Sequence, residues 1–216
     1  MARSAALFVY VADPMCSWCY GFAPELQALR ERFPRVPLHV VTGGLRAFNT
    51  QRMDAQQKDF LRHHWDEVGR RSGQPFSYAL LERDDFVYDT EPACRAVVAV
   101  REHDARLALP MLHAVQRAFY AGGLDVTRGE VLADVYGELC AREVTDFDPT
   151  AFHAAWSSEE MRQATRRDFE TVHDWGIRGF PTLIAVRDEQ AHLIAPGYLR
   201  AADLIERAAA VFDAPP

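Results

Sequence analysis

A strand–helix–strand pattern opens the sequence, and it limits the possible folds more than any other feature. Residues 7–11 form a short apolar run rich in β-branched and aromatic side chains, which predicts a buried strand. Residues 17–33 carry apolar side chains at helical spacing, and "PLHVVTGG" at 37–44 predicts a second strand closed by glycines. Such a unit cannot bury both faces of a sheet alone, so other parts of the chain must cover it.

The end of the sequence supplies the missing elements. Residues 159–175 predict a helix that stops at Gly176, and "GFPTLIAV" and "AHLIA" predict two strands paired through a turn near Asp188. Residues 201–212 predict a closing amphipathic helix. We therefore predict an α/β fold in which residues 1–48 and 158–216 form one discontinuous sheet domain.

The middle of the chain, residues 49–157, predicts an all-helical insertion domain. Its apolar side chains recur at helical spacing, and strand patterns are scarce. Four of these side chains are expected to share one buried helix face: Phe60, Leu61, Trp65 and Val68. The residues expected to cap helices are Thr90, Thr127 with Glu130 as a capping box, and Asp148 before Pro149.

Two cysteines stand three positions apart between the first predicted strand and its helix, in "DPMCSWCYGF". A cysteine at a helix N-terminus meets unpaired backbone N–H groups and the positive end of the helix dipole, which favour a thiolate. Cys16 therefore fits the nucleophile of thiol–disulfide exchange. Cys19, one helical turn later, fits the resolving thiol that attacks the mixed disulfide.

Two other interpretations of the pair are open, a structural zinc site and two inert buried thiols. Zinc needs four ligands, but Cys94 and Cys140 stand alone in the sequence. His63 and His64 are adjacent, so on a helix they point about 100° apart. We therefore predict no metal. Cys94 is a possible third redox thiol, although a buried apolar role is the commoner one, and Cys140 fits that role more strongly.

Neighbouring residues suggest further roles. Asp13 precedes Cys16 by three positions and is a possible proton relay for the resolving thiol, although an Asp–Pro turn is the favoured interpretation. Trp18, Tyr20 and Phe22 are candidates for an apolar collar around the substrate. Of these, Phe22 fits the core better.

Nearly the whole chain resembles the DsbA-like thioredoxin-fold family, which carries a large helical insertion. The resemblance rests on "DPMCSWC", "QRAFYAGGLDV" and "GFPT". It implies that Pro181 is cis and lies against the cysteine pair, whereas an ordinary trans proline is the alternative. It also implies that Phe180 offers backbone groups to the substrate beside Pro181. We expect Thr182 and Trp18 to bind the substrate with them.

Ser17–Trp18 between the cysteines differs from the Pro–His of strongly oxidising periplasmic members. The chain looks closer to cytoplasmic, FrnE-like subgroups with "CSWC" or "CPWC", described as predicted disulfide isomerases or oxidoreductases. The resemblance then implies protein or low-molecular-weight thiol and disulfide substrates. It implies no bound cofactor, with glutathione or a dithiol protein resetting the centre. The alternative is a glutathione-dependent isomerase or transferase of the chromene-carboxylate isomerase and kappa type, which usually carries serine where Cys16 stands.

Charge and hydropathy argue against a nucleic-acid-binding or membrane-spanning protein. The net charge of −7 leaves no basic footprint for nucleic acid, and no apolar run approaches the ~18 residues that span a bilayer. The apolar run at residues 5–12 superficially suggests a signal peptide, but a cut near Ala12 would delete the strand that leads to the cysteines. We therefore expect a cytoplasmic protein without structural disulfides.

Overall fold

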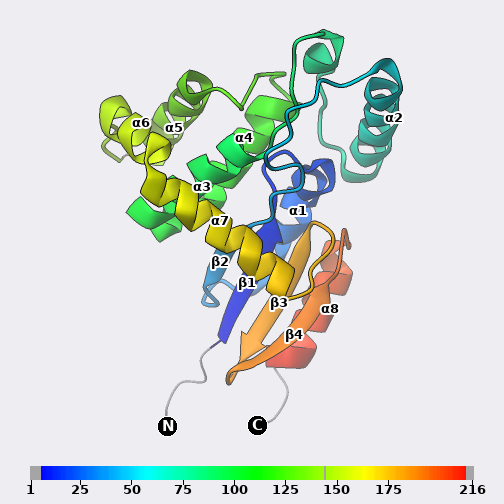
Figure 1. Cartoon of the computed structure of the whole chain (residues 1–216). Coiled ribbons are helices and arrows are strands. Elements are labelled where there is room, and N and C mark those ends of the chain that lie inside the picture. Colours follow the sequence, from blue (N-terminus) through cyan, green and yellow to red (C-terminus); the bar gives the residue numbers. More distant parts are fainter. Residues whose placement is uncertain (1–5, 144, 213–216) are drawn as a thin grey trace.

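The sheet has four strands in the order β2–β1–β3–β4 in the computed structural model, which describes residues 6–143 and 145–212. Their bounds are β1 Ala6–Ala12, β2 Leu38–Thr42, β3 Thr182–Arg187 and β4 Gln190–Ala195. β1 runs parallel to β2 and antiparallel to β3, and β3 runs antiparallel to β4. Both ends of the chain therefore supply one sheet, as predicted (Figure 1). Residues 1–5, where the signal-peptide question begins, lie outside the described residues.

Helices cover both faces of this sheet (Figure 1). α1 (Ser17–Arg32) and α8 (Ala201–Phe212) pack together on one face, and α7 (Glu159–Asp174) lies against β2 on the other. Side chains alternate along β1 accordingly. Phe8 and Tyr10 enter the main core with α1 and α8, whereas Val9 and Val11 join a smaller cluster with Val172 of α7.

The inserted helices share the core of the sheet. Their bounds are α2 Ala55–Ser72, η1 Ala79–Glu82, α3 Glu91–His103, η2 Ala105–Leu107, α4 Ala108–Tyr120, α5 Gly129–Glu143 and α6 Pro149–Ser157. One continuous buried cluster contains Phe8 of β1, Trp65 of α2 and Leu132 of α5. Tyr20 of α1 stacks on Tyr120 of α4 with ring centroids 5.1 Å apart. None of the helices in the described part of the chain has the length and apolar character needed to cross a membrane.

The predicted helix caps have mixed outcomes. Asp148 caps α6 as predicted, accepting hydrogen bonds from the backbone N–H groups of residues 150 and 151. Thr90 does stand before α3, but its backbone is already helical and its hydroxyl accepts the Arg46 N–H instead of capping. The predicted Thr127 box is also wrong: α5 begins at Gly129, and the Thr127 hydroxyl donates to Asp125. In both wrong predictions a tertiary or turn partner competes for the hydroxyl.

A buried ion pair fastens the inserted helices to the sheet. Arg101 of α3 donates two hydrogen bonds to Asp168 of α7, at 2.8 and 3.0 Å. Asp168 also accepts the backbone N–H of Thr42, the last residue of β2, at 2.8 Å. Arg101 donates to the Val40 carbonyl as well. Three elements therefore meet at one carboxylate, directly before the loop after β2 that lines the pocket at Cys16.

Asp168→Ala should lower the free energy of unfolding by about 3–5 kcal/mol, because it leaves the buried Arg101 guanidinium with only the exposed Glu102 carboxylate as an ionic partner and the Thr42 N–H without its acceptor. Chemical denaturation would measure the loss. The double variant Arg101→Met/Asp168→Leu should regain part of it. Glu138→Ala, which breaks an exposed pair with Arg142, is the matched control and should cost less than about 1 kcal/mol. Equal losses for the buried and exposed pairs would contradict this account.

Candidate active site

Cys16 stands at the N-terminus of α1, and Cys19 lies one turn inside the same helix. Cys16 is the N-cap residue with an extended backbone, and its N–H donates to the Asp13 carbonyl at 3.1 Å. Cys16 is 6% exposed and Cys19 is 0% exposed. Both thiols are free. Cys16 is therefore the more exposed of the two cysteines.

The Phe180–Pro181 peptide bond is cis, as the resemblance implied, and it lies beside Cys16. The Cys16 sulfur is 3.6 Å from the Phe180 carbonyl oxygen. Thr182 is buried, and its hydroxyl donates to the Gly179 carbonyl at 2.8 Å, so it closes the loop and does not line the pocket. The Phe180 ring packs so closely on Gly43 that a Cβ there would clash with it.

A pocket of about 330 Å³ opens in front of Cys16. Five chain segments line it: the start of α1, the loop after β2, helix α2, the stretch before α3, and the stretch before Pro181. Its lining residues are Met15, Cys16, Ser17, Trp18, Leu45, Arg46, Phe60, Leu61, His64, Trp65, Tyr88, Gly179 and Phe180. The wall is mainly apolar, and Arg46 and His64 supply its basic groups. Such a surface can receive a thiol or disulfide with an apolar or anionic neighbourhood.

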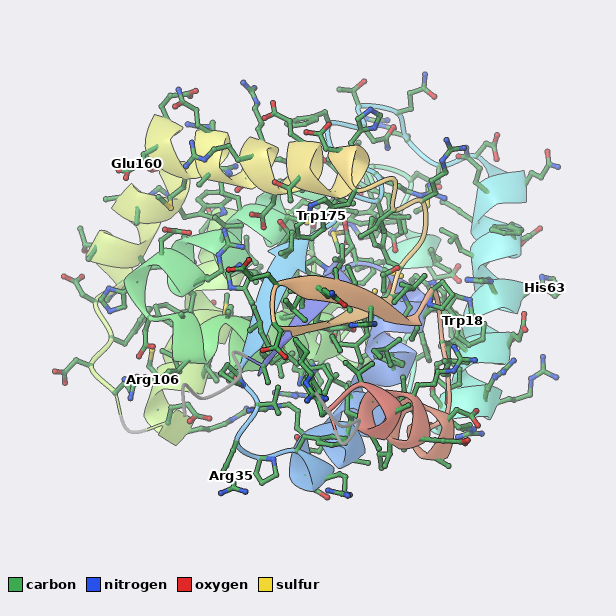
Figure 2. All side chains as sticks on the ribbon, turned by 90° about the horizontal axis from the view of Figure 1, so that it is seen from below. Trp18, Arg35, His63, Arg106, Glu160 and Trp175 are labelled. Carbon is green, nitrogen blue, oxygen red and sulfur yellow. The ribbon has the colours of Figure 1, made fainter. Side chains whose placement is uncertain are left out.

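Trp18 lies between α1 and α2, whereas His63 points outward from α2 (Figure 2). The Trp18 ring meets His64 edge-on at 5.8 Å and lies 5.4 Å from Tyr198. Arg71 of α2 sits over both Trp18 and Tyr198. Of the predicted collar, only Trp18 reaches the pocket.

Two other aromatic residues correct the sequence analysis. Tyr20, expected in the collar, is buried at 2% exposure because its ring stacks on Tyr120 of the insertion. Phe60, expected on the buried face of α2, is 63% exposed at the rim of the pocket, where it stacks on His64 at 5.8 Å. Phe22 is in the core, as favoured.

Two buried tyrosines hold the peptide unit before Cys16. The hydroxyls of Tyr88 and Tyr120 both donate to the Met15 carbonyl, at 2.5 and 2.6 Å. Burial raises the pKa of both phenols, so they remain donors at physiological pH. Sequence reasoning missed these two residues, because nothing local to them indicates that both reach residue 15.

Asp13 is wholly buried and joins the active-site turn to the loop after β2. Its carboxylate accepts the Met15 N–H at 2.8 Å and the Leu45 N–H at 2.7 Å. Burial raises the pKa of Asp13, although these hydrogen bonds oppose the shift. The Cys94 thiol donates to the same carboxylate at 3.5 Å, so Cys94 lies behind the turn as a buried thiol.

The surroundings of Cys19 disfavour a charge on its sulfur. Burial, followed by a hydrogen bond and the charge of Cys16, holds the pKa of Cys19 well above its ordinary value, and the charge of Asp13 adds to this. Cys19 is thus a thiol at neutral pH and needs help to react. Cys140 is buried in α5, on the helical block. Among the described residues, no group of three or more His, Cys, Asp or Glu is placed to hold a metal ion.

Comparisons of the sequence and of the structure with known proteins agree on one family. The family model of the DSBA-like thioredoxin domain matches residues 9–207. The structure of a candidate protein disulfide isomerase from Nitrosomonas europaea is 32% identical, with a TM-score of 0.85 over 96% of this chain and 98% of that one. The cytosolic disulfide reductase DsbM from Pseudomonas aeruginosa is 28% identical, with a TM-score of 0.72 over 88% and 89% of the two chains. Another DsbM structure contains GSH.

More distant matches carry other names. The ClpXP adapter protein SpxH from Halalkalibacterium halodurans is 23% identical over 181 residues, or 82% of this chain. The match spans only 57% of the length of that protein. A 2-hydroxychromene-2-carboxylate isomerase is 13% identical with a TM-score of 0.64 over 95% and 94% of the chains, which shows a shared fold alone.

The raised pKa of Asp13 predicts how stability depends on pH. A carboxyl whose folded pKa exceeds its unfolded pKa stabilises the fold below the unfolded value, and this contribution is lost as pH rises through the folded value. The free energy of unfolding of the reduced wild type, relative to Asp13→Asn, should therefore fall as pH rises above about 4. Urea denaturation from pH 3.5 to 7.5 would measure the difference. A constant difference across that range would contradict a buried, titrating Asp13.

Proposed function

The chain belongs to the DsbA-like thioredoxin family of thiol–disulfide oxidoreductases and isomerases, and we propose that Cys16 and Cys19 are its redox centre. The observation that carries the proposal is their asymmetry. Cys16 faces a pocket from a helix N-terminus, and Cys19 stands fully buried one turn behind it. This arrangement lets an outside sulfur reach Cys16 while excluding it from Cys19.

The exchange follows from this asymmetry. The Cys16 thiolate attacks a substrate disulfide, so a Cys16–substrate bond forms and the other substrate sulfur leaves as a thiolate. Cys19 then loses its proton and attacks the Cys16 sulfur, which releases the second substrate thiolate and leaves a Cys16–Cys19 disulfide. Two electrons pass to the substrate. A further dithiol, or two molecules of glutathione, returns them to the pair.

The pocket supports protein or low-molecular-weight disulfides as substrates. The Phe180 carbonyl beside the Cys16 sulfur is an acceptor for an incoming backbone N–H, and Pro181 fixes the turn that presents it. Trp18 and Phe60 offer apolar contacts, and Arg46 offers a cation for a carboxylate. A cytosolic setting and glutathione as redox partner fit the likeness to DsbM, a cytosolic reductase with a GSH-containing structure. No bound cofactor is part of this proposal.

The second candidate is a glutathione-dependent isomerase or transferase, which the shared fold of the chromene-carboxylate isomerase favours. That chemistry uses one residue to activate glutathione and gives no role to a second, buried thiol. The two candidate functions predict different effects when Cys19 is replaced. Its loss should abolish net disulfide exchange, whereas it should leave glutathione-dependent isomerisation intact.

Cys19→Ser should accumulate mixed disulfides on Cys16, because the thiol that resolves them is absent. Cys16→Ser should accumulate none, and both variants should lose reduction of a model disulfide such as insulin. Mass spectrometry of trapped adducts would locate the bond, with Cys140→Ser, a buried cysteine on the helical block, as the matched control. Adducts that form on Cys94 or Cys140 in place of Cys16 would show that the redox centre is misplaced.

Asp13 is the proposed proton acceptor for Cys19. Its negative charge also opposes the Cys19 thiolate, and the two effects predict opposite changes in the rate of the resolving step. As an acceptor, its removal in Asp13→Asn should slow the resolving step by about tenfold or more. As a charge that only opposes the Cys19 thiolate, its removal should make that step faster. Rapid-mixing kinetics of mixed-disulfide decay would separate the two. Cys94→Ala, which removes a thiol partner of Asp13 but keeps the carboxylate, is the control.

A further inference from the structure

Tyr10 places a hydroxyl with no hydrogen-bond partner in the middle of the core. The residue lies on β1, is 0% exposed, and shares a buried cluster with the cysteine pair. Its Oη atom is buried and unpaired within the described structure. An unpaired buried hydroxyl destabilises a fold, and phenylalanine would fill the same space without it. A tyrosine here therefore calls for an explanation beyond packing.

The Tyr10 side chain packs against the part of α1 that carries Cys19, and the two side chains interact. The Tyr10 ring stacks on Phe22 of α1 with centroids 5.8 Å apart, and Cys19 precedes Phe22 by three positions, on the same helix face. After burial, the charge of Cys19, the charge of Cys16 and an interaction with the Cys19 side chain raise the pKa of Tyr10, although the geometry of the resting dithiol does not meet that of a hydrogen bond. The phenol therefore stays protonated, and it can donate a proton to a hydrogen bond but cannot act as a base.

We propose that the Tyr10 hydroxyl donates a hydrogen bond to the Cys19 sulfur when that sulfur becomes a thiolate in the resolving step. This inference rests on the proposed redox role of the pair. A neutral thiol is a weak acceptor, so the hydroxyl is idle in the resting dithiol. The thiolate is a strong acceptor, and the bond forms as charge develops in a site that excludes water.

The step balances without any net change at Tyr10. Cys19 gives its proton to a base, for which Asp13 is the proposed acceptor, and its electron pair forms the bond to Cys16. The Cys16–substrate bond breaks, and its electrons leave on the substrate sulfur, which takes up a proton. Tyr10 keeps its own proton and lowers the energy of the charged intermediate. The titratable groups around this thiolate are Cys16 on α1, Asp13 on the preceding turn and Tyr10 on β1.

Tyr10→Phe is the direct test, with Ellman's reagent as the disulfide substrate. One equivalent added to the reduced protein releases a first thiolate when Cys16 attacks and a second when Cys19 resolves the adduct. The variant should keep the rate of the first release within about twofold and slow the second by about tenfold, as expected for one hydrogen bond to a charged group. The second release should also need a higher pH. An unchanged second release, or equal slowing of both, would overturn the proposal.

Tyr136→Phe is the matched control, because it removes a buried hydroxyl beside Cys140, which lies outside the pair. It should leave both releases unchanged. A second measurement does not depend on turnover. Thiolate absorbance in the Cys16→Ser background should show Cys19 titrating at higher pH when Tyr10 is also replaced, with Cys16→Ser/Cys19→Ala as the blank. An unchanged Cys19 titration would overturn the hydrogen bond itself. A wild type that releases only one thiolate would instead contradict the proposed function.

Discussion

The Asp13 carboxylate accepts two backbone N–H groups while it is sealed from solvent, and the position of Cys16 depends on this arrangement. One oxygen holds the Met15 N–H in the turn before the helix, and the other holds the Leu45 N–H in the loop after β2. Burial alone would favour the neutral, protonated carboxyl. The hydrogen bonds that offset the desolvation of the carboxylate also fix the geometry of the two loops. Two loops at the end of the parallel strands β1 and β2 are thereby joined into one rigid edge around Cys16.

The helical insertion supplies the parts of the candidate site that the sheet domain lacks. A strand–helix–strand unit places Cys16 at a helix N-terminus, but it supplies neither a wall to the pocket nor a clamp for the active-site turn. α2 contributes the wall through Phe60 and His64, and the hydroxyls of Tyr88 and Tyr120 clamp the Met15 carbonyl. Because the insertion and the sheet share one buried cluster, a change in the packing of α4 reaches the peptide bond next to Cys16.

The sequence predicted those features that depend on local pattern. The order of strands and helices, the split sheet and the pair at a helix start all follow from periodicity and spacing, and the cis bond before Pro181 came with the family resemblance. The residues it missed act over long separations. Tyr88 meets residue 15, and His64 meets Trp18, only after the insertion has folded onto α1. Tyr10 was hidden for another reason, because in a strand pattern it counts only as a buried aromatic side chain.

Burial suits Cys19 to its proposed resolving role and also makes that role difficult. A resolving thiol must stay away from outside disulfides, and full burial achieves this, but the same burial raises its pKa so that the reactive thiolate is scarce. No cation between the cysteines lowers the pKa of Cys19, since the two residues there are Ser17 and Trp18. A resting positive charge would also hold Cys19 as a thiolate at all times. A donor such as the Tyr10 hydroxyl differs in kind, because its hydrogen bond strengthens only as the thiolate forms, and so it assists the transfer without stabilising either neutral end state.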